Sequence, residues 1–296
     1  MSSYSAPFGA RTTLRVGGNA RSSLEIPDEA ALQALVSALD DSTPVYVLGR
    51  GSNTLVSDDG FDGVVVHLSE HFATLEIDPG SAVLRAGGAA DLPVVARRSV
   101  EAGLTGFEWA VGVPGSIGGG VKMNAGGHGS SMAKSVISAR VMDLLTGETS
   151  EMDAESLSFS YRSSSLTPHQ IVLEVSIQLE VGSAQKGRET LQEIVRWRRE
   201  NQPGGANCGS VFTNPEQGSA GALIEDAGLK GFRIGTAQVS EKHANFIQAD
   251  PGGSGNDVAA LIEAVRSAVA EHSGIVLATE VKMVGFDGPG PQVAAQ

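Results

Sequence analysis

Two glycine-rich stretches constrain the fold of this chain more than any other feature of its sequence. The first, LGRGSN at 48–53, follows an apolar run, and the second, VGVPGSIGGGVKMNAG, spans 111–126. Glycine permits tight turns and lets the backbone approach a ligand closely, and successive N–H groups in such turns can face an anion. Either stretch alone could be a pair of surface turns. Two in one chain favour a cofactor with a pyrophosphate and a flat ring.

The segments around these stretches predict a mixed chain. Apolar, β-branched runs at 45–48 and 63–68 predict strands, and 28–40 has helical spacing with Asp28 as its N-cap. The same criteria predict further strands at 82–87, 136–144, 148–152, 170–180, 233–239, 244–248 and 275–285, and further helices at 91–103, 187–200, 219–227 and 256–272. The small and polar residues at 181–188 indicate a boundary. We therefore expect an α+β chain with at least two domains.

The size, charge and cysteine content of the chain limit its partners and its compartment. With 296 residues, of which 41% are hydrophobic, it can form two or three packed domains. A net charge of −13 argues against nucleic acid as the main partner. The first 25 residues hold no apolar core of a signal peptide, and no run is apolar enough to predict a membrane span. A single cysteine fits a reducing compartment.

The stretch NCGSVFTNP, residues 207–215, raises the question of a nucleophile because it holds Cys208 and Ser210. A catalytic cysteine needs a histidine base, for which His243 is a candidate, but a lone cysteine is more often a small packing residue. Elsewhere, Arg162 in SFSYRSS and Glu280 in ATEVKMVG add one cation and one acid to the Ser210 hydroxyl. Taken singly, each of these three side chains reads as an ordinary surface residue.

Other short motifs in the sequence are weak. HLSEH at 67–71 matches a zinc peptidase pattern, but it begins inside a predicted strand, where its two histidines do not share a helix face. We therefore expect no metal site. No G-x-G-x-x-G follows the first strand, and the chain has no G-x-x-x-x-G-K-[ST], which argues against the Rossmann and P-loop classes.

Together the motifs resemble one family, UDP-N-acetylenolpyruvoylglucosamine reductase, a flavoenzyme family of bacterial peptidoglycan synthesis. The resemblance runs from about Thr12 to Gly285. The motifs that carry it are TTLRVGGNA, LGRGSNTLVSDDGFDGVV, GVPGSIGGGVKMNAGGHG, FSYRSS, CGSVFTNP, AGALIEDAGLKGFRIGTAQVSEKHANF and EVKMVG. Any one of them would be weak alone, but their combination and order are specific.

The resemblance implies a fold and a cofactor. The fold would be the vanillyl-alcohol-oxidase/PCMH-type FAD-binding fold, with two α+β subdomains and a C-terminal α+β substrate-binding domain. We expect subdomains at 8–80 and 81–186, a substrate domain at 187–274, a closing strand at 275–286 that carries Glu280, and a disordered tail at 287–296. FAD would be bound by the two glycine loops, through Leu48, Gly49, Arg50, Gly51, Ser52, Asn53, Gly112, Pro114, Gly115, Ser116, Gly118, Gly119, Asn124 and Gly126.

The resemblance also implies a reaction and roles for the scattered polar residues. NADPH would reduce the flavin, which would pass a hydride to the enolpyruvyl ether of UDP-N-acetylglucosamine and leave an enolate-like intermediate. Arg162 would stabilise the charge on the substrate carboxylate, Glu280 would polarise it in its protonated form, and Ser210 would donate the proton to carbon. Asn214, Arg198 and Lys242 are the expected substrate contacts.

Two departures from the family pattern concern the nucleotide. Some members carry a lysine for the diphosphate where Asn201 stands here, so we expect Arg198 or Arg199 to take that place. No tyrosine occurs between Arg162 and Ser210, which indicates the shorter subtype without the tyrosine loop. We expect a cytoplasmic monomer that acts on a nucleotide sugar, with no nucleic-acid or membrane partner.

Two other hypotheses remain open. An FAD-dependent alcohol or sugar oxidase would keep the same fold, but the first loop has no histidine-linked flavin motif. A flavin-binding or scaffold protein without enzymatic activity would leave the Ser210, Arg162 and Glu280 set without a role.

Overall fold

The computed structural model describes residues 5–40 and 42–286, and its contacts divide the chain into two compact units. Unit 1 comprises 1–23, 51–64 and 199–296, and unit 2 comprises 24–50 and 65–198. The tail predicted at 287–296 lies outside the described residues.

The main sheet of unit 2 has five antiparallel strands in the order β12-β11-β13-β7-β6. Their bounds are Thr149–Asp153 (β12), Val136–Asp143 (β11), Gln170–Gln178 (β13), Val83–Gly87 (β7) and Leu75–Asp78 (β6). Ala139 and Val141 on β11 alternate with more exposed residues and join the buried core, as do Val175 and Ile177 on β13. This period of two is the pattern of a strand with one buried face. Strands β7, β11, β12 and β13 confirm four of the predicted strands.

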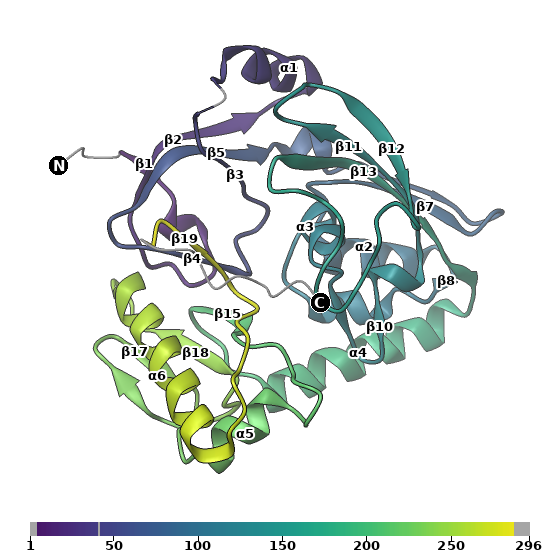
Figure 1. Ribbon diagram of the computed structural model, residues 1–296. Coiled ribbons are helices and arrows are strands. Elements are labelled where there is room, and N and C mark those ends of the chain that lie inside the picture. The colour runs from purple at the N-terminus through teal and green to yellow at the C-terminus, as the bar shows by residue number, and fades with distance from the viewer. Residues whose placement is uncertain (1–4, 41, 287–296) are drawn as a thin grey trace. The chain divides into compact units, whose positions relative to one another are not determined.

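Helices cover the buried face of this sheet. Helix α3 (Ile117–Lys122) packs against β13 and β7, and α2 (Leu92–Glu101) packs against the 3-10 helix η3 (Glu108–Gly112) (Figure 1). The core side chains of α2 recur at helical spacing: Leu92, Val95, Ala96 and Val100. The other short elements of unit 2 are β3 (Val45–Val47), η2 (Glu70–Phe72), β8 (Leu104–Thr105), β9 (Gly126–Gly127), β10 (Ser130–Ser131), η4 (Met132–Lys134) and β14 (Glu180–Val181).

Three elements contain residues of both units. They are β2 (Asn19–Ile26), β5 (Phe61–Leu68) and the long helix α4 (Ala184–Asn201). Strands β2 and β5 belong to a four-stranded sheet in the order β1-β2-β5-β3, in which β1 is Ala6–Pro7. His67 lies in β5 and His71 in η2, which confirms that HLSEH begins in a strand and is not one helix face.

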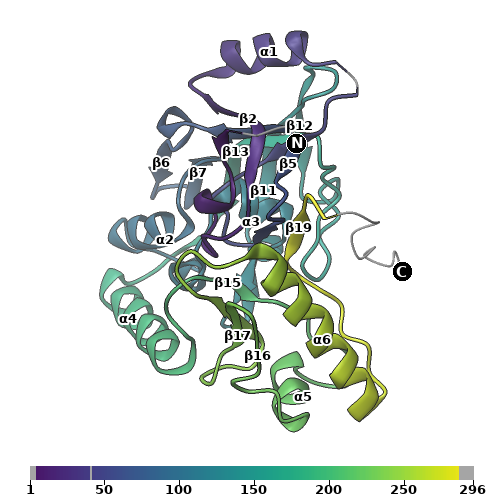
Figure 2. The same cartoon turned by 90° about the vertical axis from the view of Figure 1, so that its left-hand side faces the viewer.

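Unit 1 is built on a second sheet, in the order β15-β18-β17-β16. Its strands are Asn207–Ser210 (β15), Phe246–Ala249 (β18), Ala237–Val239 (β17) and Arg233–Ile234 (β16), and its helices are α5 (Ala220–Asp226) and α6 (Gly255–Ser273). Helix α6 runs alongside β16 and β17 (Figure 2). It buries Val258, Leu261, Ile262, Val265 and Val269 at helical spacing in the core of this unit. The unit also contains η1 (Gly9–Arg11) and β4 (Thr54–Val56).

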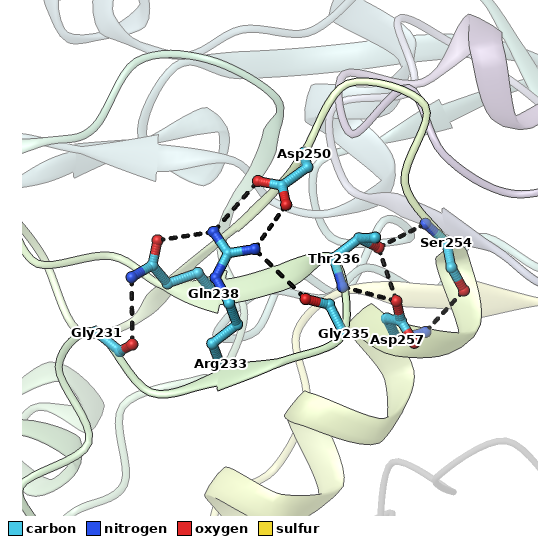
Figure 3. Close-up of polar contacts among 8 residues, drawn as sticks. All are labelled: Gly231, Arg233, Gly235, Thr236, Gln238, Asp250, Ser254 and Asp257. Atoms are coloured by element: carbon cyan, nitrogen blue, oxygen red, sulfur yellow. Dashed lines mark hydrogen bonds and ion pairs between the residues drawn. The ribbon is translucent and has the colours of Figure 1, made fainter.

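A polar network closes the β16–β17 hairpin (Figure 3). Arg233 donates to both carboxylate oxygens of Asp250, at 2.6 and 3.2 Å. Asp257 accepts hydrogen bonds from the backbone N–H and the hydroxyl of Thr236, both at 2.7 Å, and these bonds lower the pKa of Asp257. Gly235, with φ of +51°, forms the turn, so the strand predicted over 233–239 is two short strands of a hairpin.

The strand predicted over 275–285 was wrong for most of its length. The ladder contains only β19 (Lys282–Val284), which pairs in parallel with β4. The residues before β19 instead bond to the segment after β15, because Thr213 N donates to Ala278 O at 2.9 Å and Glu280 N donates to Val211 O at 2.7 Å. Glu280 therefore precedes the closing strand and does not lie within it.

None of the helices within the described residues combines the length and the apolar character that crossing a membrane requires.

An ion pair joins α1 (Glu29–Ala38) to β11 and gives the fold a pH-dependent contribution. Arg140 donates to both oxygens of Glu29, at 2.9 and 2.5 Å, and this hydrogen bonding lowers the pKa of Glu29 from 4.5. A lowered folded-state pKa stabilises the fold above the unfolded value, and that stability is lost as the pH falls through the folded value. The side chains are 35% and 45% exposed, so solvent screens the pair.

We expect Glu29→Gln to reduce the free energy of unfolding by about 0.5 kcal/mol at neutral pH. The deficit should shrink as the pH falls from the unfolded pKa of Glu29 through its lower folded pKa, because wild-type Glu29 becomes neutral over that range. Urea denaturation of both proteins at neutral and acidic pH measures it. Glu76→Gln, at an exposed position of β6, is the control and should leave the free energy of unfolding nearly unchanged. An equal deficit at both pH values would contradict the prediction.

Candidate functional site

The two glycine stretches meet within unit 2. A Cβ built on Gly49 would lie 2.6 Å from the hydroxyl oxygen of Ser116, so only glycine allows this approach without a shift. Asp91 connects the same segments: it forms a β-bridge with Ser116 and an ion pair with Arg50. Leu92 N also donates to Gly115 O at 3.0 Å. The structure thus brings together residues that lie more than sixty positions apart in the sequence.

The second stretch packs against the protein on one side and leaves part of its backbone exposed on the other. Gly118 packs on the backbone of Gly88, where a Cβ would lie 3.1 Å from the carbonyl oxygen. Ser116 is buried and its hydroxyl accepts from Gly119 N at 3.3 Å, which fixes the start of α3. Gly49, Pro114 and Gly119 are exposed. The two loops therefore present main chain with little side-chain cover, as a flat or phosphorylated ligand requires.

A buried polar atom beside these loops also fits a cofactor. The Oδ1 atom of Asp91 is buried and has no hydrogen-bond partner among the described residues, while its other oxygen pairs with Arg50. An unsatisfied buried acceptor is costly, so a donor from a bound molecule is a natural partner. With the exposed glycine backbone, this oxygen makes the residues of unit 2 suitable for FAD.

The rest of the first loop, Gly51–Asn53, belongs to unit 1. Gly51 has φ of +64° and a Cβ there would lie 2.7 Å from Thr12 Cα, so both conformation and packing require glycine. The amide of Asn53 donates to Glu280 O at 3.1 Å, and Lys282 N donates to Asn53 O at 3.0 Å. The loop is therefore joined directly to the segment that carries Glu280. Ser52 is half-buried.

Arg162 lies in a tight turn of unit 2 that is fastened to the second glycine stretch. Ser160 and Ser163 exchange backbone hydrogen bonds at 3.0 and 3.2 Å across the turn. Asn124 donates to Ser160 O at 2.7 Å and accepts from Ala133 N at 3.0 Å, so its amide binds the protein itself. Arg162 in turn donates to Gly126 O at 3.1 Å. We therefore interpret Asn124 and Gly126 as residues that hold the Arg162 turn against the second glycine stretch.

Left-handed backbone gathers in this part of unit 2. Asn124, His128, Ser158 and Arg162 have φ of +40°, +49°, +42° and +57°. Residues other than glycine rarely adopt this conformation, and such strain is typical of functional sites.

Ser210 ends β15 in unit 1, just after a distorted turn. Gly209 has φ of +77°, and its N–H donates to the side chain of Asn207 at 3.0 Å. The pairing of β15 with β18 shifts register between Asn207 and Ser210. Ser210 is half-buried, opposite Phe246. The backbone bond from Glu280 to Val211 brings Glu280 beside the residue that follows Ser210. Ser210 and Glu280 therefore lie on hydrogen-bonded segments of unit 1, while Arg162 belongs to unit 2.

Cys208 belongs to the apolar core of unit 1. It is 3% exposed, and burial raises the pKa of its thiol to about 12. His243, the candidate base, uses its Nδ1 atom to accept from Asn245 N at 3.2 Å, and burial lowers its pKa. The thiol thus stays protonated near neutral pH, which favours a packing role for Cys208.

The predicted substrate contacts have protein partners in the structure. Asn214 accepts from Ala220 N at 3.0 Å at the start of α5, and Lys242 donates to Arg199 O. Arg198 lies in α4 beside Gly112, where a Cβ would lie 2.9 Å from its Cδ, and burial lowers the pKa of Arg198.

The sequence does not predict a role in this region for two residues. Asp91 is predicted only as the start of the helix at 91–103, and Asn245 lies in the HANF motif without a visible role. No local pattern distinguishes either residue, although a polar residue between Ala244 and Phe246, both buried, is a weak signal.

Comparisons with known proteins settle the family. Residues 201–284 match the model described as UDP-N-acetylenolpyruvoylglucosamine reductase, C-terminal domain, and residues 24–153 match the FAD binding domain model. A UDP-N-acetylenolpyruvoylglucosamine reductase of Heliobacterium modesticaldum is 43% identical over 286 residues, which cover 95% of this chain and 90% of the relative. The chain belongs to the UDP-N-acetylenolpyruvoylglucosamine reductase family.

Other reductases of this family agree. The Synechococcus sp. (strain RCC307) protein is 39% identical over 94% of this chain and 92% of its own length. The crystal structure of the Thermus caldophilus UDP-N-acetylenolpyruvylglucosamine reductase superposes with a TM-score of 0.80 at 33% identity, over 93% of this chain and 96% of that one. The fold is thus α+β, with the vanillyl-alcohol-oxidase/PCMH-type FAD-binding fold followed by the C-terminal domain of the reductase family, as predicted.

Proposed function

We propose that the chain is an NADPH-dependent, FAD-mediated reductase that converts the enolpyruvyl ether of UDP-N-acetylglucosamine to UDP-N-acetylmuramate in peptidoglycan synthesis. Relatives with the name of this reductase match the chain over nearly their whole length. The proposal is carried by two contacts in unit 1. Glu280 N donates to Val211 O, in the residue after Ser210, and Glu280 O accepts from the side chain of Asn53 at the end of the first glycine stretch.

The glycine loops, with Arg50 and Asp91, would hold FAD. When bound, FAD would supply the hydride transfer that links NADPH oxidation to reduction of the terminal vinyl carbon of the substrate. Among the predicted loop residues, Gly49, Gly118 and Gly119 would act through their backbone. A Cβ at Gly49 or Gly118 would crowd Ser116 or Gly88, and Gly119 is exposed.

The chain's own residues would manage the charge and the proton. Hydride addition leaves negative charge on the adjacent carbon and its carboxylate, and Arg162 would bind that carboxylate as a fixed cation. Glu280, protonated, would donate a hydrogen bond to the same group. Ser210 would give its proton to the carbon, and a strongly basic enolate makes a hydroxyl a sufficient acid once it is positioned.

The finer assignments stay predictions. Arg198, Lys242 and Asn214 are the proposed contacts of the UDP moiety, and each lies in or beside an ordered element. The division into 8–80, 81–186 and 187–274, a monomeric state and a cytoplasmic location are likewise proposed, the last because the substrate is a soluble nucleotide sugar.

NADPH oxidation by the purified, FAD-loaded protein tests the function. We expect NADPH absorbance to fall rapidly only when the enolpyruvyl substrate is added, with UDP-N-acetylmuramate as the product. Rapid turnover of an alcohol or sugar with oxygen, and none with the enolpyruvyl substrate, would favour the oxidase. A protein that remains colourless after incubation with FAD would contradict every flavin-dependent function.

A further inference from the structure

Asn245 binds the backbone just after Ser210 through both its side chain and its main chain. Its side-chain oxygen accepts from Phe212 N at 2.9 Å, and its side-chain nitrogen donates to Phe212 O at 2.8 Å. Its main-chain oxygen accepts from Val211 N at 2.9 Å. One residue thereby binds three successive peptide groups, 210–211, 211–212 and 212–213.

The location of Asn245 explains why a side chain makes these bonds. Strand β15 ends at Ser210 and β18 begins at Phe246, so Phe212 and Asn245 both lie beyond the paired residues. A carboxamide offers one donor and one acceptor, as a peptide group does. The main chain pairs as far as Val211 N and Asn245 O, and the Asn245 side chain extends this pairing by one residue, to Phe212.

The contact is buried, which makes it costly to break. Asn245 is 3% exposed and Phe212 is 1% exposed, and both of these hydrogen bonds are buried. Removal of one partner would leave a peptide N–H and a carbonyl oxygen without water or protein partners. The segment would then have to move to recover its hydrogen bonds.

The same segment carries the two groups of unit 1 assigned to the chemistry. Ser210 immediately precedes Val211, and Glu280 N donates to Val211 O at 2.7 Å from the other side. Asn245 and Glu280 thus hold one peptide segment from two sides. A shift of Val211 and Phe212 would displace the Ser210 hydroxyl and the Glu280 backbone together.

We propose that Asn245 is a positioning residue for proton delivery, because it sets the placement of Ser210 and Glu280 through residues 211–212. The inference rests on the proposed function for its kinetic consequence. Its physical core, the fixation of this segment, does not depend on the substrate.

The test compares the two half-reactions of FAD-loaded Asn245→Ala with those of the wild type. Flavin reduction by NADPH should stay within about twofold of the wild-type rate, since it needs no proton donor. Reoxidation by the enolpyruvyl substrate should slow by about 10- to 100-fold, because displacement of a reacting group by about 1 Å can cost about 10²-fold in rate. Asn256→Ala is the matched control. Asn256 lies at the start of α6, and its side-chain oxygen also accepts from backbone in unit 1, at Asp58 N.

Amide hydrogen exchange supplies a readout without catalysis. In Asn245→Ala, exchange of the Val211, Phe212 and Glu280 amides should accelerate by at least about tenfold, while Val265 in α6 keeps its protection. Unchanged exchange at all three amides would overturn the inference whatever the activity. If wild type is not reoxidised by the enolpyruvyl substrate, the proposed function fails, and the exchange result still decides the fixation of the segment.

Asn245→Asp provides a second variant if the alanine variant loses protection throughout unit 1. The introduced carboxyl group would repel Phe212 O when ionised, whereas its protonated form restores one donor and one acceptor. We therefore expect the reoxidation rate of this variant, divided by the wild-type rate, to rise as the pH falls. The neighbouring titratable groups are His243, Glu280 and Cys208, with Lys230 and Glu225 near His243, and the division by wild type removes their contribution. A ratio independent of pH, or a wild-type reoxidation rate in either variant, would overturn the inference.

Discussion

FAD-loaded Ser210→Ala should be reduced by NADPH at nearly the wild-type rate and be reoxidised by the enolpyruvyl substrate about 10² to 10⁴ times more slowly. The first half-reaction consumes no substrate proton, so loss of the hydroxyl leaves it unchanged. The second leaves an enolate that must be protonated on carbon, and the hydroxyl at the end of β15 is the proposed acid. Single-turnover absorbance of the flavin separates the two rates.

Ser273→Ala is a suitable control for that comparison. Its hydroxyl also bonds backbone in unit 1, to Val269 O at 2.7 Å, but at the far end of α6. It should leave both half-reactions unchanged. If Ser210→Ala loses both half-reactions equally while it binds FAD like wild type, Ser210 is not the proton donor.

The Cys208 thiol should react with a disulfide reagent about 10³ times more slowly in the folded protein than an exposed thiol does at the same pH. Only the thiolate attacks, and burial raises the pKa of Cys208 from 9.0 to about 12. The thiolate fraction near neutral pH falls in proportion, and restricted access slows the reaction further. A colorimetric thiol assay, with and without denaturant, measures the ratio.

The same question can be asked of activity. Cys208→Ala removes the thiol from an apolar core and should keep most of the NADPH-dependent turnover. Rapid labelling of the native protein, or a folded Cys208→Ala that has lost turnover, would restore Cys208 as a nucleophile. The question that NCGSVFTNP raises would then have the opposite answer.

The sequence predicted the elements whose signals are local. The helix expected at 28–40 is α1, and Asp28 caps it by accepting from Ala31 N at 2.8 Å. The run of apolar and β-branched residues at 170–180 correctly predicted β13. The glycine content of 48–53 correctly suggested a tight turn, because such turns depend on residue type. The loop expected over 111–126 was only partly right, since Ile117–Lys122 form helix α3.

Contacts between distant segments could not be read in this way. Residues 275–281 are apolar and β-branched enough to resemble a strand, but their hydrogen bonds go to 211–213 and leave only Lys282–Val284 in the ladder. Asn245 looks like any polar residue before a strand until Phe212 is placed opposite it. Pairing of this kind depends on the register between segments, which composition and periodicity do not encode.

The pairing of β19 with β4 has a consequence for how the protein is made. Asn53 and Glu280 are joined although 227 residues separate them, whereas every residue of unit 2 precedes residue 199. A ribosome adds about 5–20 residues per second, so unit 2 can begin to fold on the nascent chain while unit 1 still lacks β18, α6 and β19. The hydrogen bonds that join the segments of Ser210 and Glu280 can therefore form only after residue 280 has been synthesised.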